Sequence, residues 1–144
     1  MTRSVSILGV TGSVGQSTIQ VIEELRGQGW DISVEAVAAG RRLDVLVDAC
    51  RRLKPKFAAI ADLDLLGDAK TALVGLNVEV GAGRAAIEEA GARPADWVMS
   101  AIVGAAGLTP NMAAVRRGAH VALANKECLV CAGPLFIEAA KAHG

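Results

Sequence analysis

Short apolar runs alternate with amphipathic stretches along all 144 residues, and this alternation limits the fold more than any other feature. We expect strands at residues 5–8, 33–38, 57–61, 77–80, 97–100 and 120–124. Helical spacing of apolar residues predicts helices at about 13–26, 43–53, 63–73, 85–90, 109–117 and 134–141. Most strand runs are continuously apolar, which is typical of a sheet covered on both faces. The pattern predicts an α/β fold: one doubly wound, mostly parallel sheet of the Rossmann type.

Composition narrows the possible functions. Apolar residues make up 52% of the chain, which excludes intrinsic disorder, and fifteen basic residues balance fifteen acidic ones. With aromatic residues at only 3%, nothing indicates binding to nucleic acid. Residues 97–115 carry no charge, but serine, glycine, proline and asparagine interrupt them, so we expect no membrane span. Three cysteines without a secretory leader indicate reduced thiols and a cytoplasmic protein.

The segment 9–15, with the spacing G-x-x-G-x-x-G, follows the first expected strand and opens the first expected helix. This is a variant of the dinucleotide-binding fingerprint. Gly9 would permit the tight turn, Gly12 would let a pyrophosphate approach the backbone, and Gly15 would let the helix pack closely. Backbone amides at Gly12, Ser13 and Val14 would form an anion site, to which Thr11 could add a hydroxyl. The alternative is a glycine turn without a ligand.

Two arginines follow the second expected strand. Proteins that bind NAD often have an acidic residue at this position, which accepts from the ribose 2′-hydroxyl. Here Gly40 is followed by Arg41 and Arg42, and guanidinium groups suit a phosphate dianion. The sequence therefore predicts that both arginines bind the 2′-phosphate of NADP. The alternative is a solvated pair of charges at a helix start.

Two later segments also directly follow the carboxyl ends of expected strands. Residues 101–107 form a second glycine-rich loop, which could line the nicotinamide side of the crevice or simply allow close helix packing. Asn125, Lys126 and Glu127 follow the sixth expected strand, and they could bind cofactor or a substrate phosphate or could merely start a helix. Cys128 and Cys131 have a C-x-x-C spacing, for which packing is favoured over metal or redox roles.

Three segments in order, ILGVTGSVG at 7–15, AIVGAAG at 101–107 and LANKE at 123–127, resemble the 1-deoxy-D-xylulose 5-phosphate reductoisomerase family. This family belongs to the non-mevalonate pathway of isoprenoid biosynthesis. The resemblance covers essentially the whole chain, and the last two motifs are the more specific. It implies an NADPH-dependent enzyme, both oxidoreductase and isomerase, that converts the phosphosugar 1-deoxy-D-xylulose 5-phosphate to 2-C-methyl-D-erythritol 4-phosphate.

The resemblance also implies roles for individual residues. Lys126 would contact the substrate, and the contacts to NADPH would come from Thr11, Gly12, Ser13, Val14, Gly40, Arg41, Arg42, Asn125 and Glu127. Cys128 stands where the family commonly has serine, and Val10 occupies a more varied position.

The resemblance further implies domains beyond this chain. We expect residues 1–144 to be the NADPH-binding domain, with the catalytic and C-terminal domains absent, and with no catalytic residue and no metal ligand in the chain. The divalent metal of the family, Mg, Mn or Co, would be bound elsewhere, and the full-length protein would be a homodimer. We expect the chain alone to bind NADPH weakly and to be inactive. Two alternatives are a semialdehyde or acyl-phosphate reductase domain and a non-enzymatic dinucleotide sensor.

Overall fold

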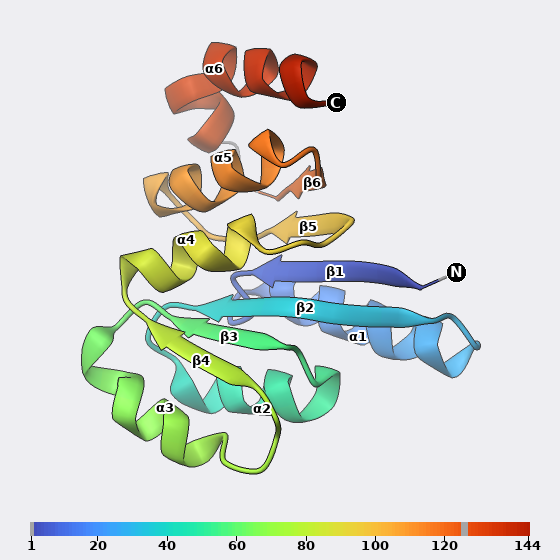
Figure 1. The fold of residues 1–144 in the computed structure, drawn as a ribbon, viewed down its shortest axis with the longest axis vertical. Coiled ribbons are helices and arrows are strands. Elements are labelled where there is room, and N and C mark those ends of the chain that lie inside the picture. The colour runs from blue at the N-terminus through green and yellow to red at the C-terminus, as the bar shows by residue number, and fades with distance from the viewer. Residues whose placement is uncertain (1, 125–126) are drawn as a thin grey trace.

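The computed structural model describes residues 2–124 and 127–144, with only the backbone described for 127, 128 and 131. Within them, six parallel strands form one sheet in the order β4-β3-β2-β1-β5-β6 (Figure 1). The strands are β1 (Arg3–Leu8), β2 (Ile32–Ala39), β3 (Phe57–Ile60), β4 (Glu79–Ala82), β5 (Trp97–Ser100) and β6 (His120–Leu123). This confirms the predicted α/β class and the parallel, doubly wound sheet.

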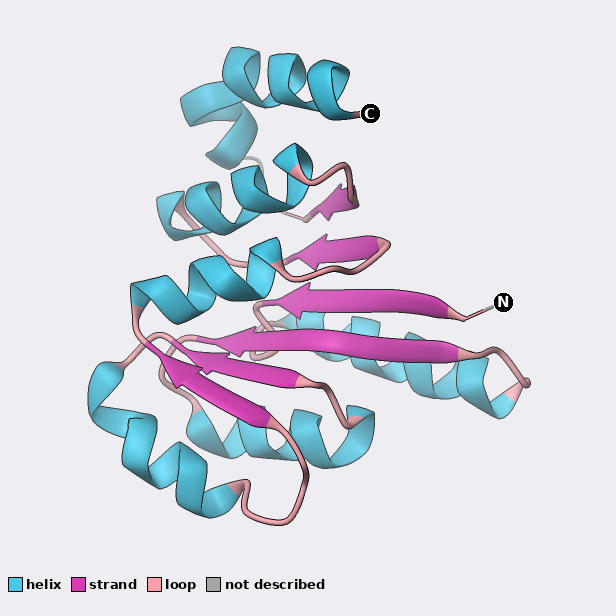
Figure 2. Ribbon diagram, viewed as in Figure 1, coloured by secondary structure: helices cyan, strands magenta, loops and turns pink. Residues whose placement is uncertain are grey.

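Helices alternate with these strands (Figure 2). They are α1 (Ser13–Gly27), α2 (Leu43–Leu53), α3 (Leu66–Ala72), α4 (Arg84–Ala92), α5 (Leu108–Arg116) and α6 (Glu127–His143). Short 3₁₀ turns at Leu63–Leu65 and Ala105–Gly107 precede α3 and α5. No helix in the described residues has the length and apolarity that a membrane span needs.

The predicted elements are confirmed in number and order, but several bounds differ by one or two residues; β1, for example, begins at Arg3 and not at residue 5. Three further differences are informative. The fourth strand lies two residues later than expected, because Asn77 adopts a left-handed φ of 53° and delays the extended backbone. The expected helix at 63–73 is divided into a 3₁₀ turn and α3. The last helix was expected to start at Pro134, whereas α6 already begins at Glu127 and bends at Ala132, where φ is −145°.

Two clusters of buried apolar residues lie between the sheet and its helices, one on each face. On one face, buried residues of β1, β2 and β3 pack against α1, α2 and α3, with Ile19, Leu46 and Leu53 among the fully buried side chains. On the other face, Leu8 and Val98 lie among the residues covered by α4 and α5. Helix α6 packs beyond α5 through Phe136 and Val115. Helices therefore cover both faces, and the loops at the carboxyl ends of the strands are left open.

Candidate functional site

The loop between β1 and α1 is shaped by two glycines with different constraints. Gly9 adopts a φ of 96°, and its N–H and that of Val10 both donate to the carbonyl oxygen of Ala38 at 2.9 Å. A Cβ on Gly15 would collide with the Gly9 carbonyl oxygen and would lie 2.8 Å from Val10 Cα. The first turn of α1 therefore packs directly on this loop. The sequence predicted both roles, although Gly15 approaches the loop rather than the sheet.

The same loop contacts the second glycine-rich segment. A Cβ on Gly9 would lie 2.7 Å from the carbonyl carbon of Ala101 and 3.0 Å from the nitrogen of Ile102. The Ala101 N–H in turn donates to the Leu8 carbonyl oxygen at 2.7 Å. Backbone therefore lies against backbone where β1 and β5 end, and the two loops that the sequence singled out form one continuous wall.

Gly12 is different because no contact with the described residues requires it to be glycine. It is the N-cap of α1 with an ordinary φ of −81°, and no atom of the described chain lies within 4 Å of a Cβ built on it. No side chain caps α1, and the first intrahelical bond in this turn runs from Gln16 N–H to the Gly12 carbonyl oxygen at 2.9 Å. The amides of Ser13 and Val14 therefore belong to the unpaired first turn of a helix, which favours an anion.

A cavity of about 560 Å³ lies beside this turn at the carboxyl ends of the strands. Small and apolar residues dominate its walls, which come from both glycine-rich loops, from the ends of β2 and β3, and from α4 and α5. Its lining residues are Gly9, Thr11, Gly12, Ala38, Ala39, Gly40, Ala61, Arg84, Ile87, Glu88, Ala101, Ile102, Val103, Ala105, Ala106, Thr109 and Pro110. Its volume is within the range of sites for small molecules and cofactors.

The two predicted phosphate-binding arginines do not line this cavity. Arg41 has an 84% exposed side chain, and its Nε lies 3.2 Å from an Asp62 carboxylate oxygen. Arg42 forms a two-pronged pair with Asp44, at 3.1 Å and 3.0 Å. That hydrogen-bonded guanidinium lowers the pKa of the Asp44 carboxyl below its ordinary value. Both arginines are exposed, and each already has an acidic partner, which the sequence analysis did not foresee.

The remaining predicted contacts give a mixed result. Thr11, Gly12 and Gly40 line the cavity, and Ser13 and Val14 begin α1 beside it. Asn125 and Lys126 lie outside the described residues. Glu127 starts α6, but its side chain, like those of Cys128 and Cys131, is not described.

Sequence reasoning missed two charged residues of the cavity, Arg84 and Glu88, which come from the first two turns of α4. The signal that could have found them is the same one that drew attention to Gly40. Arg84 directly follows a glycine at the carboxyl end of a strand, where the ligand crevice of an open parallel sheet lies. Glu88 then follows at a spacing of one helical turn.

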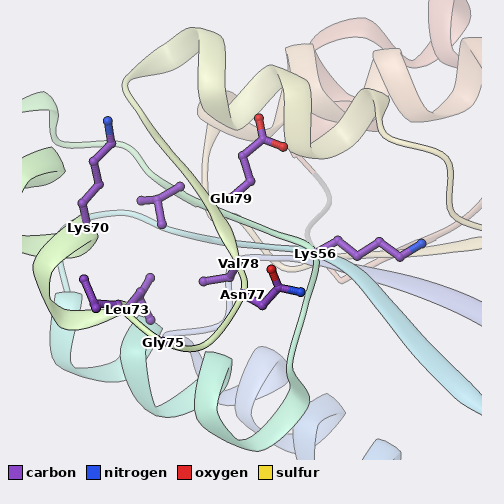
Figure 3. Close-up of a pocket in the computed structure, with 9 residues that line it drawn as sticks. Lys56, Lys70, Leu73, Gly75, Asn77, Val78 and Glu79 are labelled. Carbon is purple, nitrogen blue, oxygen red and sulfur yellow. The ribbon is translucent and has the colours of Figure 1, made fainter.

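Two other cavities lie at the opposite end of the sheet. One, of about 700 Å³, lies next to the segments that lead into β3 and β4 (Figure 3), and among its lining residues are Lys56, Lys70, Asn77 and Glu79. The other, of about 590 Å³, lies where β5 and β6 begin and includes Asp96 and Arg117. The described residues contain no group of three histidine, cysteine or acidic side chains arranged to hold a metal ion.

The strand order, the glycine-shaped β1–α1 turn and a nucleotide-sized cavity at the carboxyl edge define a Rossmann-type α/β domain. Comparison with known proteins places it more closely. The chain belongs to the 1-deoxy-D-xylulose 5-phosphate reductoisomerase family, whose model matches residues 5–133. This confirms the resemblance seen in the sequence, and it sets aside the semialdehyde and acyl-phosphate reductase alternative.

Individual members of the family are similar to this chain in sequence and in structure. The reductoisomerase of Bradyrhizobium diazoefficiens is 53% identical over 142 residues, which cover 99% of this chain and 34% of the relative. The reductoisomerase of Caulobacter vibrioides is 51% identical over 142 residues, which cover 99% of this chain and 35% of that relative. The structure of the Zymomonas mobilis enzyme in complex with NADPH matches 100% of this chain and 37% of that chain, at 47% identity and a TM-score of 0.95.

A further solved reductoisomerase, in complex with NADPH, fosmidomycin and magnesium, covers 99% of this chain and 35% of its own at 34% identity and a TM-score of 0.90. This chain thus spans about a third of the length of the relatives that it matches.

Proposed function

We propose that this chain is the NADPH-binding part of a reductoisomerase that converts 1-deoxy-D-xylulose 5-phosphate to 2-C-methyl-D-erythritol 4-phosphate. The observation that carries the proposal is the cavity between the two glycine-rich loops, with the open first turn of α1 at its edge. The NADPH complex of the Zymomonas relative, which matches this fold along its whole length, supports it. Residues 1–144 are the cofactor domain in this proposal, and the remaining domains of the relatives supply the metal site and the dimer contact.

Gly12 is the direct test of whether the residues present fit a dinucleotide. Both Gly9 and Gly15 are required by contacts inside the protein, whereas Gly12 lines the cavity and a Cβ on it would meet no atom of the described residues. Bare backbone at this position has a use only if something else must approach it. A pyrophosphate fits, because the unpaired amides of Ser13 and Val14 follow directly.

Each predicted contact then has a defined task. Thr11, Gly12, Ser13 and Val14 bind the pyrophosphate, and Gly40 leaves room for the adenosine ribose. Asn125 and Glu127 orient the nicotinamide half, and Lys126 binds the substrate phosphate. NADPH, when bound, supplies a hydride to a carbonyl carbon. The chain itself binds the dinucleotide, orients it across the strand ends and excludes water with the apolar wall of residues 101–106.

Arg41 and Arg42 contact the 2′-phosphate by exchanging their present partners. Ion pairs at the surface, such as those with Asp62 and Asp44, contribute little to stability, so a phosphate dianion can replace a carboxylate at small cost. The proposal therefore does not need a large rearrangement of the backbone.

Titration of the chain with NADPH and NADH tests this function. We expect NADPH to bind more tightly, and we expect Arg41→Ala with Arg42→Ala to remove most of that preference, by about 10-fold or more, since hydrogen bonds to charged groups contribute about 1.5–3 kcal/mol each. Arg51→Ala with Arg116→Ala is the matched control, because both side chains are exposed and lie outside the cavity. Equal affinities of the unaltered chain for the two dinucleotides would contradict the phosphate assignment.

The proposal also covers activity. The chain spans about a third of its relatives, and its described residues provide no cluster for a divalent metal. The 144 residues alone therefore bind NADPH without oxidising it when substrate and Mg²⁺ are added. Metal-dependent loss of NADPH absorbance with the purified chain would contradict this.

A further inference from the structure

Arg84 and Glu88 are two opposite charges inside the cavity, and the described residues give neither of them a charged partner. Both line it, and they lie four residues apart on α4. Neither forms an ion pair with the other or with any other described residue. An Arg–Glu pair at this helical spacing ordinarily stabilises a helix by contact between the two side chains. Their separation therefore leaves the donors of one and the acceptors of the other available to a ligand.

The position of Arg84 is fixed by the turn before it. Gly83 adopts a φ of 88°, its N–H donates to the Ile60 carbonyl oxygen at 2.8 Å, and a Cβ there would lie 2.7 Å from a methyl group of Leu63. Helix α4 must therefore begin where β3 and β4 end. Ala86 and Ala90 bury the opposite side of the helix against the sheet, so Arg84, Ile87 and Glu88 share the face toward the cavity.

The cavity wall next to Arg84 is suited to a flat heterocycle. Ala39, Gly40 and Ala61 at the ends of β2 and β3 are small, and Ile87 adds an apolar side chain. No aromatic residue lines the cavity in the described part of the chain, so no ring is available to stack on a base. A guanidinium is the planar group that takes this place, because it stacks on aromatic faces and keeps its charge.

We propose that Arg84 and Glu88 recognise the adenine of the dinucleotide: the Arg84 guanidinium stacks on the ring, and the Glu88 carboxylate accepts a hydrogen bond from the exocyclic amino group. This assignment rests on the proposed NADPH-binding function and adds its base specificity. Gly40, at the predicted ribose position, lines the same cavity as Arg84, so the base attached to that ribose lies within the same walls.

The first experiment distinguishes a contact with the adenine ring from a contact with the 2′-phosphate. Arg84→Ala should weaken the binding of NADPH and of NADH to the same extent, roughly three- to tenfold, because a stacking contact with adenine is independent of the 2′-phosphate. Arg51→Ala should change neither affinity. A loss confined to NADPH would overturn the assignment of Arg84 to adenine and place it on the phosphate instead, and unchanged affinities would also overturn it.

The second experiment addresses Glu88 with the hypoxanthine analogue of NADPH, in which a carbonyl oxygen replaces the amino group. The analogue gains a donor at the ring nitrogen N1, but at the position of the amino group the carboxylate faces a second acceptor. The unaltered chain should therefore bind the analogue about 10-fold more weakly. Glu88→Gln should bind both dinucleotides nearly equally, because its amide can donate to the carbonyl, whereas Glu138→Gln on α6 should retain the full preference. Equal binding of both dinucleotides by the unaltered chain would overturn the Glu88 role alone. Failure of the unaltered chain to bind NADPH at all would overturn the proposed function together with this inference.

Discussion

The three glycines of the β1–α1 turn, Gly9, Gly12 and Gly15, have separable roles. Gly9 and Gly15 make close contacts inside the protein, and Gly12 makes none. The sequence pattern identified all three positions, because the G-x-x-G-x-x-G spacing follows from geometry that any strand–turn–helix of this class needs. It also assigned Gly12 to a ligand and the other two to the fold, but it did not predict their partners, because the contacts of Gly9 with Ala101 and of Gly15 with Val10 depend on how the segments meet in space.

The first prediction contrasts two glycine substitutions. Gly12→Ala should leave the stability within about 0.5 kcal/mol, since its φ of −81° suits alanine and the added methyl group meets no atom, but it should weaken NADPH binding at least 10-fold. Gly15→Ala should destabilise the fold by several kcal/mol, because its Cβ would overlap the Gly9 carbonyl oxygen. Urea denaturation and NADPH titration measure the two effects.

Gly67→Ala on α3 serves as the control, because a Cβ there also meets no atom and the position lies far from the cavity. It should retain NADPH affinity and be slightly more stable, since alanine favours a helix over glycine. A Gly12→Ala variant with unchanged affinity would remove the main support for a pyrophosphate at this turn.

The second prediction concerns Cys50, a fully buried thiol on α2. Burial raises its pKa to about 12, so it stays protonated at neutral and mildly alkaline pH. In a Cys128→Ser, Cys131→Ser background, which isolates this thiol, an aromatic disulfide reagent at pH 8 should react only after urea unfolds the chain. Rapid labelling of the folded protein would show that α2 opens locally, in conflict with its packing in the core.

At the scale of elements, sequence reasoning placed strands better than their ends or their ion pairs. Residues 97–100 were predicted with the bounds that the structure has, because the run starts after Asp96 and ends on the polar Ser100. The fourth strand was misplaced because glycine and asparagine near position 77 do not reveal which residue takes the left-handed conformation. The ion pair between Arg41 and Asp62 joins residues 21 positions apart, so no local pattern could predict it.

The third prediction concerns the segment that joins β1 to β5. Asp96 accepts hydrogen bonds from the Ser4 amide at 2.9 Å and the Ser4 hydroxyl at 3.1 Å. The hydrogen bond from the amide is the main cause that lowers the pKa of the Asp96 carboxyl below its ordinary value. A carboxyl with a lowered folded-state pKa contributes stability above its unfolded pKa, and that contribution is lost as pH falls through the folded value. Asp96→Asn should therefore be less stable at pH 7, with the difference shrinking at and below pH 3.

Thermal denaturation of both proteins from pH 2 to pH 7 measures this difference. Asp68→Asn, a substitution at an exposed position on α3, should follow the unaltered chain across the range. A constant gap between Asp96→Asn and the unaltered chain at every pH would mean that the lost interaction does not depend on the carboxylate charge.

The fourth prediction concerns a buried carboxylate in β2. The pairing of β1 with β2 skips Glu35, because Val5 faces Val34 and Ser6 faces Ala36. Glu35 is only 5% exposed, and it forms ion pairs with Arg93 at 3.1 Å and Lys56 at 3.2 Å. Arg93→Ala should cost about 2–4 kcal/mol, since it leaves a buried carboxylate with one exposed partner.

Adding Glu35→Gln to Arg93→Ala should recover part of that loss, because the uncompensated charge is then removed. Urea denaturation of the single and double variants forms the complete cycle. If the loss of unfolding free energy in the double variant equalled the sum of the two single losses, the two side chains would not be coupled. The irregular β1–β2 pairing at Glu35, rather than the charges, would then set the stability of this region.

At the scale of the whole molecule, the alternating pattern determined the fold class, because a parallel sheet with both faces covered is the arrangement that buries six apolar runs separated by helices. The cavity was predictable in its position at the carboxyl edge but not in its full lining. Residues of α4 reach it only because that helix lies over the sheet on the same face as α5 (Figure 1), which sequence order alone does not specify.

The fifth prediction is that stability differs across the molecule. The cluster over β1, β2 and β3 contains many fully buried side chains, whereas the one that holds α6 has Val115 and Phe136 as its buried residues among those described. Amide hydrogens in the described part of α6 should therefore exchange at least 100-fold faster than those of β2, because local opening exposes little apolar surface there. Native-state hydrogen exchange measures this directly, and equal protection would indicate one cooperative unit.

The seam where Gly9 meets Ala101 consists of main-chain atoms on both sides, although the two residues lie far apart in sequence. A relative that has glycine at position 9 should therefore preserve this contact whatever side chain it has at position 101. A breakpoint for recombining this domain with distant members of its family, placed in the loop before β5, should give hybrids whose halves still fit together here. Libraries of such hybrids would vary cofactor recognition while keeping the same backbone contact between the two loops.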